Sequence, residues 1–172
     1  ILTKYSYIDR MMQVQCIILT MAIIGGTSGH WSYTGDTGPA NWPDQCTQGQ
    51  SQSPIDIVTS EAKQVGKNKA LYFWHYGSQL KGSVVNNGHS MQFNPGKPSK
   101  LILTGGTLDK GEKYRLEQLH FHWGSNANQG SEHTMDGIQY ALEMHLVHMN
   151  TKYIKNDTEA LLNDDGLAVV SV

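Results

Sequence analysis

The chain has 172 residues, a length typical of a single domain, and a formal net charge of −2. It contains no cluster or stripe of basic residues, which argues against a nucleic-acid partner. Glycine is abundant and only 16% of the residues are charged, so the composition favours a loop-rich, mainly β protein over a helical one.

A short apolar run at residues 16–24 dominates the N-terminal region, and small residues follow it at 25–29. This pattern is typical of a secretory signal peptide, and the run is too short to span a bilayer. We interpret residues 1–10 as leader sequence and 1–29 together as leader plus signal peptide. This interpretation predicts a secreted or extracellular protein without a membrane span. The alternative is a buried N-terminal helix or strand.

Aromatic residues and prolines punctuate the segment 30–55, which predicts turns and loops rather than regular elements. Its cysteine, Cys46, is the only one outside the proposed signal peptide, because Cys16 lies in the apolar run. The mature chain would therefore keep Cys46 either as a free thiol or as half of a disulfide whose partner is missing.

The middle of the chain alternates strand-like runs with turn signals. Apolar, β-branched and aromatic side chains predict strands at residues 71–76, 82–86 and 101–103. The dipeptide Asn87-Gly88 is a strong signal for a tight turn, and His89 follows it directly.

The stretch 114–123 predicts a strand that carries His120 and His122 two residues apart. Side chains at positions i and i+2 of a strand point to the same face, so both imidazoles leave one side of a sheet. The alternate apolar side chains from Leu119 to Trp123 point the other way, and we expect them to enter an apolar environment.

A second alternating run, 139–149, follows the hairpin signal Asp136-Gly137 and places Glu143 and His145 on one face. If the two runs lie close together, three neutral histidines converge from a rigid sheet. Three such nitrogen donors form the ligand set of a catalytic zinc site, which leaves a fourth position for water.

The histidine pair alone is weak evidence, because single histidines on sheets are usually hydrogen-bonded structural residues. The combination predicts Zn²⁺ bound by His120, His122 and His145. A metal-bound histidine usually donates its second ring nitrogen to a carboxylate or carbonyl, so we expect Gln118 and Glu143 to hold the ligands.

Two further elements are predicted at the end of the chain, a short helix at 156–162 and a strand at 167–172. Asn156 begins the sequon Asn-Asp-Thr and is a candidate glycosylation site in a secreted protein. Chance matches to this motif are common, so an unmodified asparagine is the alternative.

Taken together, these motifs resemble the core of the alpha-class carbonic anhydrases. The resemblance rests on the segments 52–55 (QSPI), 86–90 (NNGHS), 118–124 (QLHFHWG), 131–134 (SEHT) and 143–148 (EMHLVH). It implies a mainly β fold with a few short helices around a large twisted mixed sheet. Residues 30–172 would then be the N-terminal portion of one domain that is incomplete at its C-terminus.

The resemblance also implies an activity, the zinc-dependent reversible hydration of carbon dioxide to bicarbonate and a proton, in a monomeric enzyme. His89 matches the proton shuttle of the family. Glu132 matches a buried glutamate that orients a threonine hydroxyl, and that threonine would lie beyond residue 172, so we expect Glu132 to lack a partner. In secreted members a cysteine at the position of Cys46 pairs with one further downstream. Positions that line the substrate pocket are matched by Tyr33, Gln92, Gln118, Val147 and Val169.

Two other hypotheses stay open. Some relatives have lost activity and serve as adhesion or matrix domains, but these typically lose a zinc histidine and this sequence keeps all three. The other hypothesis is that residues 30–172, as a fragment with unpaired strand edges, are aggregation-prone and nearly inactive.

Overall fold

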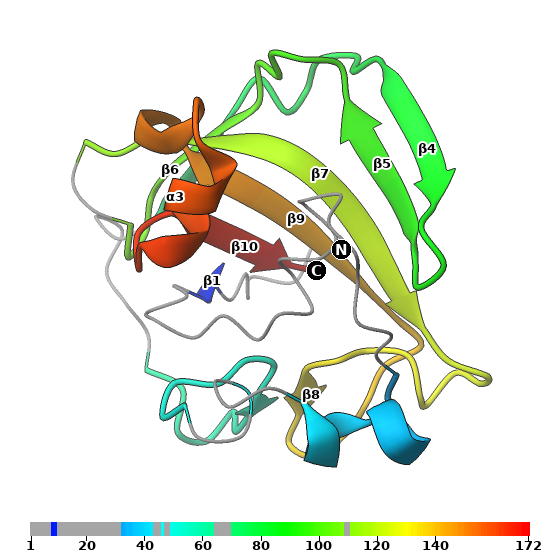
Figure 1. Cartoon of the computed structure of the whole chain (residues 1–172). Coiled ribbons are helices and arrows are strands. Elements are labelled where there is room, and N and C mark those ends of the chain that lie inside the picture. The colour runs from blue at the N-terminus through cyan, green and yellow to red at the C-terminus, as the bar shows by residue number, and fades with distance from the viewer. Residues whose placement is uncertain (1–7, 10–31, 43–45, 47–48, 64–69, 109–110) are drawn as a thin grey trace.

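The computed structural model describes residues 8–9, 32–42, 46, 49–63, 70–108 and 111–172. This part of the chain is mainly β with a few short helices around one large sheet, which confirms the predicted class (Figure 1). The strands of the large sheet are β1 (Ile8–Asp9), β3 (Leu71–Trp74), β4 (Gly82–Asn86), β5 (Met91–Pro95), β6 (Ile102–Gly105), β7 (Tyr114–Trp123), β9 (Leu142–Asn150) and β10 (Leu167–Ser171). The described helices are α3 (Asp157–Leu162) and 3₁₀ turns at Gly35–Thr37, Pro39–Asn41 and Thr151–Tyr153.

The large sheet has the strand order β1-β10-β9-β7-β5-β4, while β6 pairs with both β7 and β3. All of its described ladders are antiparallel. The parallel pairing expected of a mixed sheet occurs instead in a separate two-stranded sheet, between β2 (Asp56–Ile57) and β8 (Thr134–Met135).

Strands β7 and β9 lie in the middle of the sheet, and their register positions the histidines. His120 lies opposite His145, and His122 lies opposite Glu143. On the other side of β7, Gln92 of β5 is the partner of His120. Residues that are distant in sequence therefore form one row across three neighbouring strands.

A β-bulge divides β7 into two halves with opposite facing patterns. The pairing with β9 shifts between Leu116 and Gln118, which leaves Glu117 as the extra residue. In a regular strand, residues 116 and 119 would face opposite sides of the sheet. The extra residue of the bulge puts Leu116 and Leu119 on the same side, where both pack against the same apolar cluster. Gln118 and His120 are thereby directed to the opposite face.

The core consists of two apolar clusters. The larger cluster contains Leu101, Leu103, Leu108, Tyr114, Leu116, Leu146, Ala168 and Val170, and the smaller contains Met149, Ala160, Leu161 and Leu167. The smaller cluster joins α3 to β9 and β10, and Figure 1 shows α3 against the end of the sheet where β10 begins.

Several predicted elements are confirmed with the expected bounds, including the strands at 82–86 and 114–123. The Asp136-Gly137 hairpin is also confirmed. Both residues have positive φ, and the backbone amides of Met135 and Ile138 each donate to the carbonyl of the other residue. The sequence analysis missed β5, where Asn94 and Pro95 disfavour a strand but pair with β4 at the sheet's edge.

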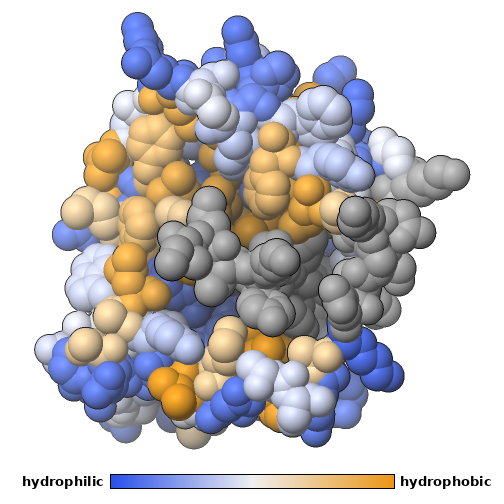
Figure 2. All heavy atoms as spheres, turned by 180° about the vertical axis from the view of Figure 1, so that it is seen from behind, coloured by the Kyte–Doolittle hydropathy of each residue, from blue (hydrophilic) through white to orange (hydrophobic). Residues whose placement is uncertain are grey.

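The alternate apolar side chains from Leu119 to Trp123 were expected to enter an apolar environment. This expectation is correct only near the middle of β7. Leu119 packs on the core, whereas Trp123 is 54% exposed and its cross-strand partner Leu142 is 52% exposed. Figure 2 shows apolar side chains gathered on the face of the molecule seen from behind. In general, large contiguous apolar patches mark sites of association, whereas single exposed apolar residues are ordinary.

Most of the proposed leader and signal segment, including the apolar run 16–24, lies outside the described residues. Within it, Ile8 and Asp9 pair antiparallel with Val170 and Val169. In the described part of the chain, none of the helices has the length and apolar character to cross a membrane.

Candidate metal centre

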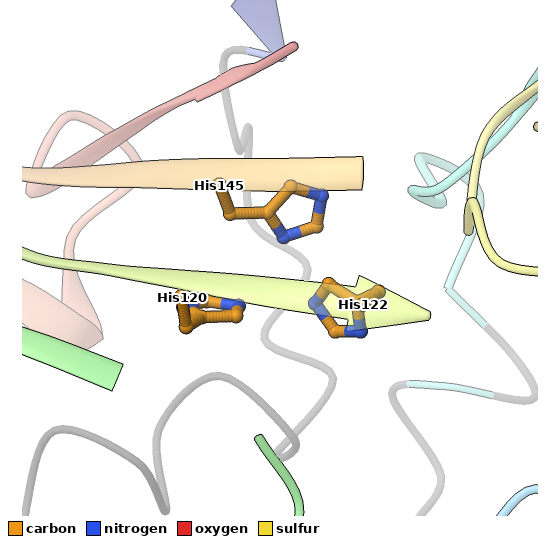
Figure 3. Close-up of side chains that lie close together, drawn as sticks. All are labelled: His120, His122 and His145. Atoms are coloured by element: carbon orange, nitrogen blue, oxygen red, sulfur yellow. The ribbon is translucent and has the colours of Figure 1, made fainter. Parts of the chain in front are cut away.

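Three imidazoles, two from β7 and one from β9, lie close together on one face of the sheet (Figure 3). The ring centroids of His120, His122 and His145 are separated by 4.7 to 5.1 Å. One nitrogen from each ring lies within 4.8 Å of the others, so the three residues can hold a single metal ion. The predicted convergence of the two strands is thus present.

The ring of His120 is oriented by Gln118. Its Nδ1 lies 2.8 Å from Gln118 Oε1, and because a carbonyl oxygen only accepts, Nδ1 carries the proton and donates. Nε2 is then the free donor atom for a metal. Burial, followed by the neighbouring rings of His145 and His122, lowers the pKa of His120 to about 3. The imidazole is therefore neutral at physiological pH, as a metal ligand must be.

Glu143 orients the ring of His145 in the same way. His145 Nε2 donates to Glu143 Oε1 at 2.5 Å, which leaves Nδ1 free. The ring of His133 donates to the same oxygen at 2.6 Å, and the backbone amides of Glu132 and His133 donate to the other oxygen at 2.9 and 2.8 Å. Burial opposes ionisation of Glu143, but these hydrogen bonds outweigh it and lower its pKa.

His122 supplies the clearest indication that the centre fits a cation. Its Nε2 is buried and has no hydrogen-bond partner among the described residues. The nearest acidic atom, Glu132 Oε2, lies 3.4 Å away without hydrogen-bond geometry. Burial lowers the pKa of His122 as well, against the opposing charge of Glu132. An unpartnered neutral nitrogen beside two others fits Zn²⁺, which binds three histidines in catalytic sites.

A second group, His133, Glu143 and His145, also has the composition of a metal site. Its atoms are already hydrogen-bonded to one another, and His133 Nε2 lies 3.3 Å from Ser53 Oγ. His133 is therefore a structural, hydrogen-bonded residue in this arrangement.

The expectation that Glu132 lacks a partner is wrong, because the hydroxyl of Tyr33 donates to Glu132 Oε1. The same hydroxyl lies 3.5 Å from His122 Nδ1, so Tyr33 touches the metal centre at two points. Burial, and then the charge of Glu132, raises the pKa of Tyr33. The hydroxyl therefore stays protonated and acts as a donor.

The predicted pocket residues lie on the same face as the histidines. Gln92 is the cross-strand neighbour of His120, and Val147 is the neighbour of Gln118. Val169 pairs with Val147 from β10. Val147 is fully buried and Val169 is 7% exposed, so they form an apolar wall beside the polar centre.

His89 lies at the exposed turn between β4 and β5, next to the strand that carries Gln92. Two neighbours that the sequence analysis did not single out, Asn87 and Ser90, hold this turn through side-chain hydrogen bonds. Their presence in the same NNGHS motif as His89 is the signal that could have identified them.

Two modification sites were also predicted. Cys46 is disulfide-bonded in the structure, whereas we expected it to lack a partner in this chain, and no described cysteine is free. Asn156 is exposed and its side chain accepts from the Glu159 amide at the start of α3.

Residues 37–172 match the family model described as eukaryotic-type carbonic anhydrase. The chain is 43% identical over 151 residues to carbonic anhydrase 7 of Mus musculus, which covers 84% of this chain and 56% of that protein. Carbonic anhydrase 7 of Homo sapiens is 42% identical with the same coverage. Carbonic anhydrase 1 of Monodelphis domestica is 38% identical over 146 residues, covering 83% of this chain and 55% of that protein.

The chain spans about half the length of the curated relatives it matches. The matched part nevertheless includes the whole histidine centre and both strands that carry it. From this match and from the three convergent imidazoles, we conclude that the chain belongs to the alpha, or eukaryotic-type, carbonic anhydrase family.

Proposed function

We propose that this protein catalyses the reversible hydration of carbon dioxide to bicarbonate and a proton, with zinc as its cofactor. The observation that carries the proposal is the arrangement of the three histidines. His120 and His145 have their second nitrogens committed to Gln118 and Glu143, so their free nitrogens face the buried, unpartnered nitrogen of His122.

When bound, zinc supplies the chemistry for which carbonic anhydrase is the reference case, lowering the pKa of a water molecule to about 7. The protein's part is to present neutral ligands and keep their geometry fixed. Burial keeps His120 and His122 neutral, and the Glu143 carboxylate fixes the tautomer of His145.

The remaining residues account for the substrate and the proton. Carbon dioxide is small and apolar, and the wall formed by Val147 and Val169 offers it an apolar surface beside the centre. We assign His89 as the proton acceptor, because it matches the proton shuttle of the family and lies in the exposed turn next to the strand that carries Gln92. Tyr33 and Glu132 form a hydrogen-bonded pair against His122 that is suited to orient a water molecule.

Zinc content and carbon dioxide hydration, measured on the same preparation, test the proposal. We expect one zinc ion per chain and a hydration rate well above that of buffer. His122→Ala should abolish both, whereas His75→Asn, at an exposed histidine with positive φ, should leave both unchanged. A protein that binds zinc without hydrating carbon dioxide would support the alternative of a non-catalytic binding module.

We further propose that the protein is secreted and acts as a monomer without nucleic-acid partners. The apolar run at 16–24 with its following small residues supports secretion. Expression in a secreting eukaryotic cell should release protein that begins near residues 25–29. Retention of the N-terminus inside the cell would contradict this.

Glycosylation of Asn156 is part of the same proposal. The residue is exposed, and a glycan on Nδ2 leaves Oδ1 available to cap α3. Asn156→Gln should remove a mass shift that a glycosidase also removes, and an identical mass for both secreted proteins would rule the glycan out.

A further inference from the structure

A second group of polar side chains, outside the metal centre, surrounds the bulge of β7. Glu117 is only 8% exposed, and its Oε1 accepts from Nε and Nη2 of Arg115 at 3.0 and 2.9 Å. Its Oε2 lies 3.1 Å from Nζ of Lys97, which follows the end of β5. We call these three residues the charged cluster. One carboxylate faces two cations, so the charged cluster keeps an excess of one positive charge.

The charged cluster lies on the same face of the sheet as the three histidines. Arg115 and Glu117 alternate along β7 with Tyr114 and Leu116, which belong to the larger core cluster, so their side chains point to the opposite face. The cross-strand pairing agrees, because Arg115 lies opposite Met149, which shares its face of β9 with the apolar wall of the pocket. The pocket and the charged cluster therefore lie on one face.

The charged cluster is also continuous with the metal centre along β7. Glu117 is followed by Gln118, whose Oε1 accepts from His120 Nδ1 at 2.8 Å. Three residues of extended strand separate Glu117 from His120, a backbone distance of about 10 Å. Figure 1 shows β5, which leads to Lys97, running beside β7. The charged cluster is thus close to the metal centre but separate from its ligands.

Both cations keep hydrogen-bond donors that Glu117 does not use. A guanidinium has five N–H groups, and only two of those of Arg115 bond to described residues. The buried side-chain atoms without a partner in the described part of the chain are Gln118 Nε2 and His122 Nε2, so the remaining N–H groups of Arg115 reach solvent. The side chain of Lys97 is 70% exposed, and its Nζ carries three N–H groups. Donors on two cations are therefore available to a ligand from solution.

The charge and the donors of the charged cluster fit a small planar oxyanion. Arginine presents its N–H groups in a fixed fork that matches the two oxygens of a carboxylate or carbonate group, and a neighbouring ammonium adds a further charge-assisted hydrogen bond. The excess positive charge disfavours a cation, and a neutral apolar molecule gains nothing from these donors. Bicarbonate, the anion of the proposed reaction, has the required shape and charge.

We propose that Arg115 and Lys97 form a bicarbonate-binding site beside the metal centre, and that Glu117 holds the two cations in place. The inference rests on the proposed function, which makes bicarbonate the relevant anion on this face of the sheet. The site holds the anion after it leaves the centre in hydration and before it enters in the reverse reaction, because a positive potential raises the local concentration of anions. Glu117 also competes with the ligand for both cations, so binding is weak and reversible.

Nuclear magnetic resonance of the zinc-loaded full chain tests the site directly. Titration with sodium bicarbonate, at constant pH and ionic strength, should shift the Nε–H signal of Arg115 saturably. Sodium acetate, which has a planar carboxylate group, should do the same, whereas sodium chloride at equal concentration should shift the signal less. The absence of a saturable shift with either oxyanion, or a shift confined to the ring protons of the metal ligands, would overturn the proposal.

Two variants should change the affinity for bicarbonate in opposite directions. Lys97→Gln removes a cation and should weaken binding about two- to fivefold, the effect of one exposed ion pair. Glu117→Gln removes the competing carboxylate and should strengthen binding by a similar factor. A purely structural role of the charged cluster predicts weaker binding in both variants, so weaker binding in Glu117→Gln would contradict the proposal.

Lys100→Gln is the matched control, because it removes the same charge from an exposed lysine three residues beyond Lys97. This variant should bind bicarbonate like the wild type. A loss of affinity as large as that in Lys97→Gln would attribute the effect to net charge and overturn the proposal. These titrations do not depend on turnover. If the chain does not hydrate carbon dioxide, the proposed function fails, and the acetate titration still decides whether the charged cluster binds planar oxyanions.

Discussion

At the scale of single residues, the metal centre depends on which ring nitrogen of each histidine carries the proton. Gln118 and Glu143 take the protonated nitrogens of His120 and His145, and this leaves the free nitrogens pointing to one place. Of these two supports, Glu143 is the more connected, since it also binds His133 and two backbone amides.

Glu143→Gln tests this support. The neutral amide cannot accept from two rings and two backbone amides at once, so the orientation and basicity of His145 should suffer. We expect zinc affinity, measured by competition with a chelator, to fall by about 10- to 100-fold. Glu61→Gln, an exposed glutamate in a turn, is the matched control and should bind zinc like the wild type.

His148 provides a pH-dependent contribution to stability on the core face of β9. It is fully buried, its ring bonds to the hydroxyl of Tyr76 and to the carbonyl of Ala168, and burial lowers its pKa to about 4. Between about pH 6.5 and 4 the unfolded chain binds a proton here that the folded chain does not. The contribution of His148 to the free energy of unfolding is about 3 kcal/mol. It is fully present above pH 6.5 and is lost as the pH falls toward 4.

Urea titrations of the zinc-free protein between pH 7 and pH 4 measure this loss. In His148→Gln the slope of unfolding free energy against pH should decrease by about 1.4 kcal/mol per unit in that window. The slope that remains comes from other groups such as His120. Identical slopes in both proteins would mean that His148 titrates normally in the folded state.

At the scale of elements, the bulge at Glu117 decides which face of β7 carries the ligands. Leu116 in the first half of the strand and Leu119 in the second half both face the core. The alternation of core-facing residues therefore shifts by one position between the two halves. An uninterrupted strand could not bury both residues and also present His120 to the pocket.

Deletion of Glu117 should therefore abolish zinc binding, because it forces either the core residues or the histidines to the wrong face. The control Glu117→Gln keeps the bulge and loses only the charge that pairs with Arg115 and Lys97. It should be less stable by about 1–3 kcal/mol but still bind zinc. Calorimetric zinc titration separates the two outcomes, and full binding in the deletion variant would contradict the role of the bulge.

At the scale of the whole molecule, a metal bound by the three histidines would join β7 and β9 across the centre of the sheet. Zinc binds the folded centre in preference to the unfolded chain, so it should raise the free energy of unfolding. At a free zinc concentration 100 times Kd the gain is about 2.7 kcal/mol. Thermal melts with and without zinc measure it, and His122→Ala should show no shift.

The exposed apolar surface belongs to the same scale. Trp123, Leu142 and Met91 are each more than half exposed in the described structure. Our hypothesis that residues 30–172 alone are aggregation-prone predicts concentration-dependent sedimentation, which Trp123→Glu should reduce. A single monomeric species at all concentrations would exclude this behaviour.

Local features of the sequence determined the class of the fold and the identity of the ligands. Alternation placed His120 and His122 on one face, and the Asn-Gly and Asp-Gly signals placed tight turns, because each depends on residues adjacent in the chain. The resemblance to the family motifs added Glu132, Tyr33 and His89 as candidate site residues.

Only the tertiary structure decided how these pieces combine. Tyr33 donates to Glu132 across 99 residues of sequence, Ser90 binds Phe121 across 31, and the bulge at Glu117 depends on pairing with β9. Strand β5, against its own propensities, forms because β4 and β7 flank it. Contacts between distant segments reflect the packing of the whole sheet, and no periodicity within one segment encodes them.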